Sequence, residues 1–276
     1  MNALEIRGLT KRRGDFALQG LDLTLPAGCI MGLIGENGAG KSTTIRLILN
    51  ALSRDGGTVA VYGKDNRALT PLEREDIGAV LDEVGLPEYM TARQIGCMMA
   101  GIFTCWQPEV YRDYLRRLAL PEDKPFRDFS RGMKMKQGLA VALSHQPKLL
   151  LLDEATSGLD PVVRDEILTI FADFTRDEEH AVLISSHIVS DLEKICDYIA
   201  FLHKGRLLLC EEKDRLTEAY GILRGGTDGI APAAVCGRHT TPYGTEYLVR
   251  RDAVPVGMAL GQVNIEDLFV FMAKEV

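Results

Sequence analysis

The sequence contains no apolar run long enough to cross a membrane. Its longest stretch without a charged residue, Gln94 to Pro108, is shorter than the roughly 20 apolar residues that a membrane-spanning helix needs. The first residues, Met1 to Arg7, alternate in the manner of a strand and lack the apolar core of a signal peptide. These absences predict a soluble chain, and they leave open that the chain docks on a membrane protein.

The chain also lacks paired cysteine spacing and an excess of positive charge. Its six cysteines lie far apart with no C-x-x-C spacing, so neither a zinc site nor a disulfide framework is predicted, and we expect reduced thiols in the cytosol. The formal net charge of −7 argues against a chain built to neutralise the backbone of a nucleic acid. Hydrophobic residues make up 46% of the chain, which predicts a well-buried core.

A phosphate-binding pattern stands near the N-terminus. The residues Gly35 to Thr43 read Gly-Glu-Asn-Gly-Ala-Gly-Lys-Ser-Thr, which fits the pattern G-x-x-x-x-G-K-[ST]. An apolar run of strand length, Cys29 to Ile34, precedes it, and Ser42 to Asn50 has a mixed helical spacing. Because the motif and both flanking elements agree, we favour a phosphate loop over the alternative of a glycine-rich turn before an ordinary helix.

The residue types of this loop suit an anion. Its glycines allow the backbone to fold around a phosphate with its N–H groups inward, and the following helix N-terminus adds partial positive charge. Lys41 is expected to reach the outer phosphates of ATP, and Ser42 to ligate Mg²⁺. The loop residues expected to contact the nucleotide are Gly35, Asn37, Gly38, Gly40, Lys41, Ser42 and Thr43.

Strand and helix patterns alternate through the first 220 residues. Alternating apolar residues from Leu4 to Leu25, around a basic turn at 11–14, predict two antiparallel strands. Four leucines, 149–152, predict a parallel strand buried on both faces. Further strands are expected at 29–34, 58–62 after a Gly56-Gly57 turn, 77–81, 181–185, 198–203 and 206–210. Helices are expected at 42–50, from the capping residue Thr91 to about 103, 108–118, from Ser130 to about 143, from Asp160 to 174, 188–196 and 265–273.

These patterns predict an α/β protein with a phosphate-loop NTPase core and a mainly parallel sheet. An N-terminal antiparallel β subdomain and an inserted helical subdomain at about 82–145 complete a first domain over residues 1–220. Residues 221–276, where glycines and prolines break the pattern, are expected to form a small C-terminal module.

An acidic pair follows the leucine strand. Asp153 ends the strand and Glu154 comes next. In a phosphate-loop enzyme a carboxylate at this place holds the metal, often through water, and a second carboxylate can orient the attacking water. The alternative is an ordinary acidic turn at a strand end. His187 follows the strand 181–186 and could contact a phosphate, although a lone histidine usually has no such role.

Five ordered motifs in residues 1–220 resemble those of the nucleotide-binding subunit of an ATP-binding cassette transporter. They are the phosphate loop, the signature segment Phe129 to Met133, Leu149 to Glu154, Ser157 to Asp160 and Ser185 to His187. The resemblance implies a homodimer or heterodimer, arranged head to tail, in which the signature helix of one subunit closes over ATP bound by the other. It further implies that Glu154 is the catalytic carboxylate, that His187 senses the γ-phosphate, and that Asp160 links the two sites.

The signature segment also has a physical interpretation of its own. A helix N-terminus at Ser130 to Met133, with Gly132 permitting close backbone approach, is suited to an anion such as the γ-phosphate. One chain cannot place this helix end on its own phosphate loop, which is why a dimer is expected.

Three positions depart from the family pattern. Arg13 stands where the family usually has an aromatic residue that stacks on adenine, so stacking must come from the guanidinium plane, come from Phe16, or be weak. Arg131 replaces a glycine of the signature segment. Asp82 replaces a metal-contacting glutamine, and we expect it either to act as a metal ligand or to cap the helical region that follows.

The predicted function is an ATP-hydrolysing subunit that powers a separately encoded transmembrane permease from the cytoplasmic face of the cell membrane. Export of a small molecule, peptide or drug is favoured on general similarity to small export-type cassettes. The alternatives are a soluble cassette ATPase with a non-membrane partner, a plain phosphate-loop kinase, and an ATP sensor without turnover. Soluble cassette ATPases usually carry two cassettes in one chain, a coiled-coil insertion or zinc-ligand cysteines, and this sequence has none of these. The signature segment argues against a kinase.

Overall fold

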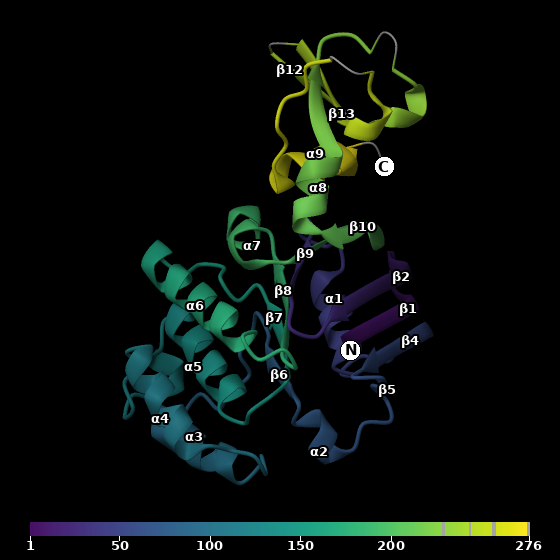
Figure 1. Cartoon of the computed structure of the whole chain (residues 1–276). Coiled ribbons are helices and arrows are strands. Elements are labelled where there is room, and N and C mark those ends of the chain that lie inside the picture. Colours follow the sequence, from purple (N-terminus) through teal and green to yellow (C-terminus); the bar gives the residue numbers. More distant parts are fainter. Residues whose placement is uncertain (228–229, 243, 256–257, 275–276) are drawn as a thin grey trace.

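The computed structural model describes residues 1–227, 230–242, 244–255 and 258–274. A central sheet separates a helical region from an N-terminal antiparallel sheet, and a smaller module containing α9 and β13 lies at the opposite end of the molecule from α3 and α4 (Figure 1).

The central sheet has six strands in the order β10-β9-β3-β8-β7-β6, and all of them are parallel except β10. This confirms the predicted mainly parallel sheet, and the predicted strands at 198–203 and 206–210 form an antiparallel hairpin at its edge. The strands are β3 (Ile30–Ile34), β6 (Ile77–Val80), β7 (Leu149–Asp153), β8 (Ala181–Ser186), β9 (Tyr198–His203) and β10 (Arg206–Glu212).

Both faces of this sheet are buried, because alternate residues of each strand enter different cores. Leu150 and Leu152 of β7 join the core under the helical region, whereas Leu149 and Leu151 join the core under the N-terminal sheet. All four are fully buried, so a strand in this place must be apolar at every position. Burial on both faces therefore explains why β7 contains four leucines in a row.

The N-terminal sheet has the order β2-β1-β4-β5, with antiparallel pairing throughout. Its strands are β1 (Asn2–Arg13), β2 (Phe16–Pro26), β4 (Gly56–Val61) and β5 (Lys64–Asp65). The predicted turn at Gly56-Gly57 is wrong, because β4 already begins at Gly56. Gly57 has φ +80° and a side chain there would lie 2.3 Å from the Gly8 carbonyl oxygen; the glycine serves a close strand approach at a shift of register.

The helices lie close to their predicted positions. Thr91, Ser130 and Asp160 cap α3, α5 and α6 as expected. However, α3 ends at Ala100 rather than near 103, since Gly101 terminates it. The helices before residue 200 are α1 (Lys41–Ile48), α2 (Pro71–Arg74), α3 (Ala92–Ala100), α4 (Pro108–Arg117), η1 (Phe126–Asp128), α5 (Arg131–Leu143), α6 (Pro161–Phe174) and α7 (Val189–Ile195). The short α2, whose capping box at Thr70 and Glu73 is visible in the sequence, was not predicted.

The C-terminal module contains a sheet that the sequence patterns did not predict. Its order is β11-β13-β12, and it is antiparallel. The glycines and prolines between these short strands obscured their alternation. The elements after β10 are α8 (Lys213–Ala219), β11 (Tyr220–Arg224), η2 (Pro232–Ala234), β12 (Val235–Thr241), β13 (Gly244–Arg250), η3 (Arg251–Ala253) and α9 (Ile265–Lys274).

This module shares a core with the rest of the chain. The rings of Phe201 in β9 and Phe269 in α9 lie 5.4 Å apart. The N–H group of Ile265 donates to Glu193 Oε1 of α7 at 2.7 Å. Because Leu268 and Phe271 of α9 belong to the same buried cluster as the helical region, the module cannot be removed without exposing apolar surface.

Membrane-spanning length is not reached by any helix within the described residues.

We expect Gly205→Ala to destabilise the fold by about 3 kcal/mol, measured as the free energy of unfolding in urea. Gly205 donates its N–H to the Ala39 carbonyl of the phosphate loop, has φ +78°, and leaves only 1.9 Å between an added Cβ and the Ala17 carbonyl oxygen. Gly63→Ala is the matched control, because Gly63 has φ +81° with nothing within 4 Å; it should cost about 1 kcal/mol. Equal losses would show that the close approach to Ala17 is not a constraint.

Candidate functional site

The phosphate loop lies between β3 and α1, and its glycines are required by close neighbours. A side chain at position 35 would come within 2.4 Å of the Leu202 carbonyl oxygen of β9. Gly40 has φ +113°, and a side chain there would meet the Phe16 ring at 2.7 Å. The loop is therefore pressed against β9 on one side and β2 on the other, which holds the N-terminus of α1 at the edge of the sheet.

Lys41 is the buried cation of this loop. Its side chain is only 6% exposed, and its Nζ donates to the carbonyl oxygens of Gly35 at 2.7 Å and Glu36 at 3.3 Å. The same Nζ lies 3.2 Å from Glu154 Oε1. A buried ammonium group requires such partners, and here the loop backbone and one carboxylate provide them.

A cavity of about 390 Å³ opens in front of the loop. It brings together most of the sequence-predicted nucleotide contacts and two of the three residues that depart from the family pattern, Arg13 and Asp82. Its lining residues are Arg13, Phe16, Glu36, Asn37, Gly38, Gly40, Lys41, Ser42, Thr43, Asp82 and Glu154.

The acidic pair is positioned by Ser185 at the end of β8. Ser185 Oγ donates to Asp153 Oδ1 at 2.6 Å, and the Glu154 N–H donates to the Ser185 carbonyl at 3.1 Å and approaches its Oγ at 3.2 Å. Glu154 has φ +54°, a left-handed conformation that is strained for this residue type. The strand therefore stops at Asp153 and turns the next carboxylate toward the phosphate loop.

Glu154 also joins the phosphate loop to His187. Its second oxygen, Oε2, lies 2.7 Å from His187 Nδ1, while Oε1 faces Lys41. His187 is about half exposed, whereas Glu154 is 14% exposed. One carboxylate thus contacts both the cation of the loop and the histidine that follows β8.

No residue of the signature segment is among the described residues that line this cavity. One residue of the segment, Arg131, contacts a residue at the cavity edge. Arg131 Nη2 donates to Asp82 Oδ1 at 2.6 Å, and Ser130 Oγ accepts from the Met133 N–H as the cap of α5. The alternative role of Asp82 as a helix cap is wrong, because α3 begins ten residues later and is capped by Thr91.

The loop before α6 lies beside the signature segment. A side chain at Gly132 would meet Leu159 Cδ2 at 3.1 Å, and Gly158 faces the Arg131 side chain. The Asp160 carboxylate accepts from the Val163 N–H at 3.0 Å. In this subunit Asp160 therefore caps its own helix.

Two residues near the site were missed by sequence reasoning. Glu36 occupies a variable position of the phosphate pattern, so its place in the cavity lining had no sequence signal. Its Oε2 lies 3.7 Å from Nδ1 of the buried His203. Ser185 was expected only as part of a switch motif, but it bonds the Asp153 carboxylate and the backbone N–H of Glu154. Its position at the carboxyl end of a strand next to β7 was the available signal.

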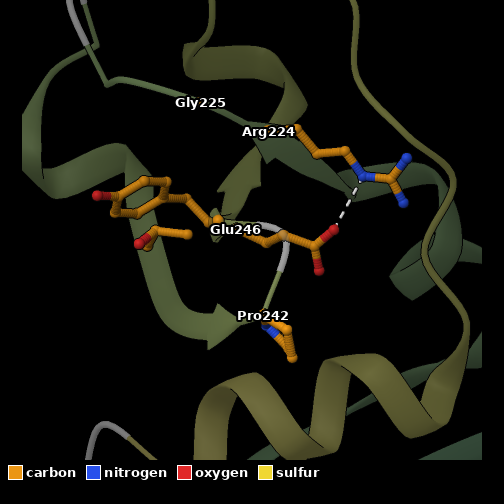
Figure 2. Close-up of a pocket in the computed structure, with 7 residues that line it drawn as sticks. Arg224, Gly225, Pro242 and Glu246 are labelled. Atoms are coloured by element: carbon orange, nitrogen blue, oxygen red, sulfur yellow. Dashed lines mark hydrogen bonds and ion pairs between the residues drawn. The ribbon is translucent and has the colours of Figure 1, made fainter.

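A larger cavity, of about 800 Å³, lies away from this site in the C-terminal module. Figure 2 shows Arg224 of β11 and Glu246 of β13 reaching toward each other beside Pro242, with Arg224 Nε donating to Glu246 Oε1 at 2.8 Å. The charges of these two residues compensate one another. Size alone therefore does not mark the chemistry, and the smaller cavity with Lys41 and Glu154 is the candidate site.

Comparisons with known proteins point to one family. The family model described as ABC transporter matches residues 18–157. The ABC transporter ATP-binding protein YtrB of Bacillus subtilis (strain 168) is 31% identical over 218 residues, which cover 79% of this chain and 74% of YtrB. The lantibiotic transport ATP-binding protein SrtF of Streptococcus pyogenes is 32% identical over 217 residues, covering 76% of this chain and 91% of SrtF.

A solved structure of an ATP-binding subunit of an ABC transporter superposes with a TM-score of 0.72 at 26% identity, over 78% of this chain and 92% of that one. Together with the phosphate loop and the acidic pair, these likenesses confirm the predicted phosphate-loop fold. The chain belongs to the ABC transporter family, as an ATP-binding subunit that couples ATP hydrolysis to the work of a membrane permease.

Proposed function

We propose that this subunit powers the export of a small molecule, peptide or drug through a separately encoded permease. The observation that carries the ATP-hydrolysing part of the proposal is the contact of Glu154 with both Lys41 and His187 in front of the phosphate loop. Similarity to a protein named for lantibiotic transport supports the cargo class. ATP hydrolysis by the purified chain, measured alone and with its permease, tests the proposal; an absence of turnover in both would favour an ATP sensor.

Residues of this chain have separate parts in hydrolysis. Lys41 binds the outer phosphates of ATP, and the loop N–H groups at Gly38 and Gly40 surround them. Glu154 accepts the proton of the attacking water, and His187, hydrogen-bonded to Glu154, contacts the γ-phosphate. Arg13 and Phe16 at the cavity edge stack on the base.

The donor atoms present fit Mg²⁺. Ser42, Asp153 and Asp82 would hold it with hydroxyl and carboxylate oxygens, the hard ligands that Mg²⁺ prefers. Asp153 is 1% exposed, and one of its oxygens is fixed by Ser185, so its orientation is set before the metal binds. When bound, the metal neutralises charge on the phosphates.

A second nucleotide-binding subunit, identical or different, completes the site. Of the described residues that line the cavity, none belongs to α5. The signature residues Ser130, Arg131 and Gly132 are therefore available to close over ATP held by a partner subunit, with Asp160 at the dimer contact. ATP sandwiched in this way holds the two subunits together.

A groove next to the site suits the permease. It has a volume of about 630 Å³ and combines apolar side chains with three carboxylates and with the cations of Arg131 and Lys134. Because Arg131 is paired with Asp82, two carboxylates and one cation remain, so the permease segment that enters the groove should be apolar with a basic residue. Through this contact the subunit is peripheral to the cytoplasmic face of the cell membrane. The lining residues are Asp82, Glu83, Val84, Gly85, Leu86, Glu88, Phe126, Phe129, Arg131, Lys134 and Met135.

Lys41→Ala should weaken ATP binding by about tenfold to a hundredfold, because the buried side-chain cation of the loop is lost. Equilibrium titration of the purified chain with a fluorescent ATP analogue measures this. Lys64→Ala, which removes an exposed ammonium group paired with Glu73, is the control. Unchanged affinity in Lys41→Ala would contradict the role given to this lysine.

Glu154→Gln should slow hydrolysis by roughly a hundredfold or more while leaving ATP binding intact. The amide keeps the shape of the side chain, but it removes the charge that competes with phosphate for Lys41. Steady-state turnover and sizing with ATP and Mg²⁺ should show an inactive, stable dimer. Glu179→Gln, at an exposed ion pair, should behave as the parent; a monomeric Glu154→Gln chain would count against the sandwich dimer.

Discrimination between ATP and GTP should be slight, since a guanidinium plane at Arg13 stacks on either base. Competition titrations should give affinities within about tenfold of each other, a difference below roughly 1.4 kcal/mol. Arg13→Ala should weaken both nucleotides equally. A larger preference for ATP would mean that another residue reads the base.

A further inference from the structure

Two residues that depart from the family pattern are in direct contact. Arg131 begins α5, Asp82 follows β6, and Arg131 Nη2 donates to Asp82 Oδ1 at 2.6 Å. The side chains are 59% and 50% exposed. Within residues 1–227, 230–242, 244–255 and 258–274, neither side chain makes a further hydrogen bond or ion pair. Each is therefore the other's polar partner in this subunit.

The pair stands at the border of two sites. Asp82 lines the cavity of Lys41, Ser42 and Glu154, and it also lines the adjoining groove together with Arg131. One nitrogen of the Arg131 guanidinium contacts Asp82, and the other two lie near the loop before α6, where a Cβ at Gly158 would be 3.9 Å from them. Arg131 is thus placed between the metal-side carboxylate and the loop before α6.

This ion pair is suited to exchange. An exposed pair is only weakly favoured over its separated, hydrated charges. A terminal phosphate carries more charge than a carboxylate and accepts a guanidinium group in two parallel hydrogen bonds. The N-terminus of α5 adds its own attraction for an anion. A phosphate that reaches this helix end would therefore take Arg131 from Asp82.

We propose that Asp82 and Arg131 exchange partners when the dimer closes. Arg131 leaves Asp82 for the terminal phosphate of ATP held by the partner subunit, and the released Asp82 carboxylate turns to the Mg²⁺ and phosphates of its own subunit. The proposal rests on the sandwich dimer of the proposed function, and it adds a coupling that belongs to this chain's own residues.

The exchange links the two nucleotide sites. ATP at one site frees a metal ligand at the other, so MgATP binds with positive cooperativity, and the linkage is reciprocal. Without a divalent cation the released carboxylate faces the phosphates unscreened, and like charges oppose closure. Dimerisation should therefore depend on Mg²⁺ through Asp82.

The test uses the full chain carrying Glu154→Gln, so that ATP persists. Sedimentation measures the ATP concentration needed for half-maximal dimer, with Mg²⁺ or with EDTA. Adding Asp82→Asn should lower this concentration in EDTA by about fivefold, which is ~1 kcal/mol, and should not lower it comparably in Mg²⁺. Adding Arg131→Gln should raise it in both. Asp128→Asn, an exposed carboxylate paired with Arg127 beside α5, is the matched control and should change neither value.

The outcomes separate this exchange from a pair that only holds the fold. A pair that only holds the fold predicts that Asp82→Asn raises the ATP requirement equally in Mg²⁺ and EDTA. That result, or an unchanged ratio of the ATP requirement in EDTA to that in Mg²⁺, overturns the exchange but leaves the sandwich dimer standing. If the Glu154→Gln chain does not dimerise with MgATP, the sandwich dimer fails and the exchange fails with it. Thermal unfolding of each variant establishes that all are folded.

Discussion

Burying a lysine ammonium group costs free energy unless it is fully paired, and the arrangement of this site follows from how Lys41 is paired. Two loop carbonyls accept from it, and Glu154 lies 3.2 Å away. The carboxylate reaches Lys41 because the backbone of Glu154 adopts φ +54°. Under the proposed role of Lys41, an ATP phosphate bound by this loop would compete with Glu154 for the same ammonium group. Glu154 also contacts His187, so a change in the Lys41 contact would reach the residue that follows β8.

The sheet brings these groups together. The parallel strands β3, β7 and β8 end at the same edge, where the phosphate loop follows β3 and where Asp153 and Ser185 lie at the ends of β7 and β8. Two buried cores, one on each face of the sheet, hold the strands in register. A shift of β7 by one residue would exchange Leu149 and Leu151 with Leu150 and Leu152 and displace the acidic pair. The positions of the acidic pair and of Ser185 are thus set by packing at some distance from them.

Much of this arrangement could be predicted from local patterns. The phosphate loop, the leucine strand and the caps at Thr91, Ser130 and Asp160 each depend on neighbouring residues, and the structure confirms these elements. Contacts between distant residues could not be predicted in the same way. The Asp82 and Arg131 pair joins positions 49 residues apart. Gly57 was predicted to lie in a turn because the group that requires a glycine there, the Gly8 carbonyl, lies on another strand. The strands of the C-terminal sheet were not predicted, because glycines and prolines interrupt their short alternating patterns.

The C-terminal module lies at one end of the molecule (Figure 1), yet its contacts lead to elements of the candidate site. His187 stands just before α7, and Glu193 of α7 accepts the N–H that begins α9. Phe269 of the same helix packs on Phe201 of β9, the strand whose Leu202 carbonyl lies under Gly35. The module therefore supports both the histidine helix and the strand beneath the phosphate loop. Deleting residues 221–276 would disturb both supports at once, so its role must be studied by substitutions on its outer surface rather than by truncation.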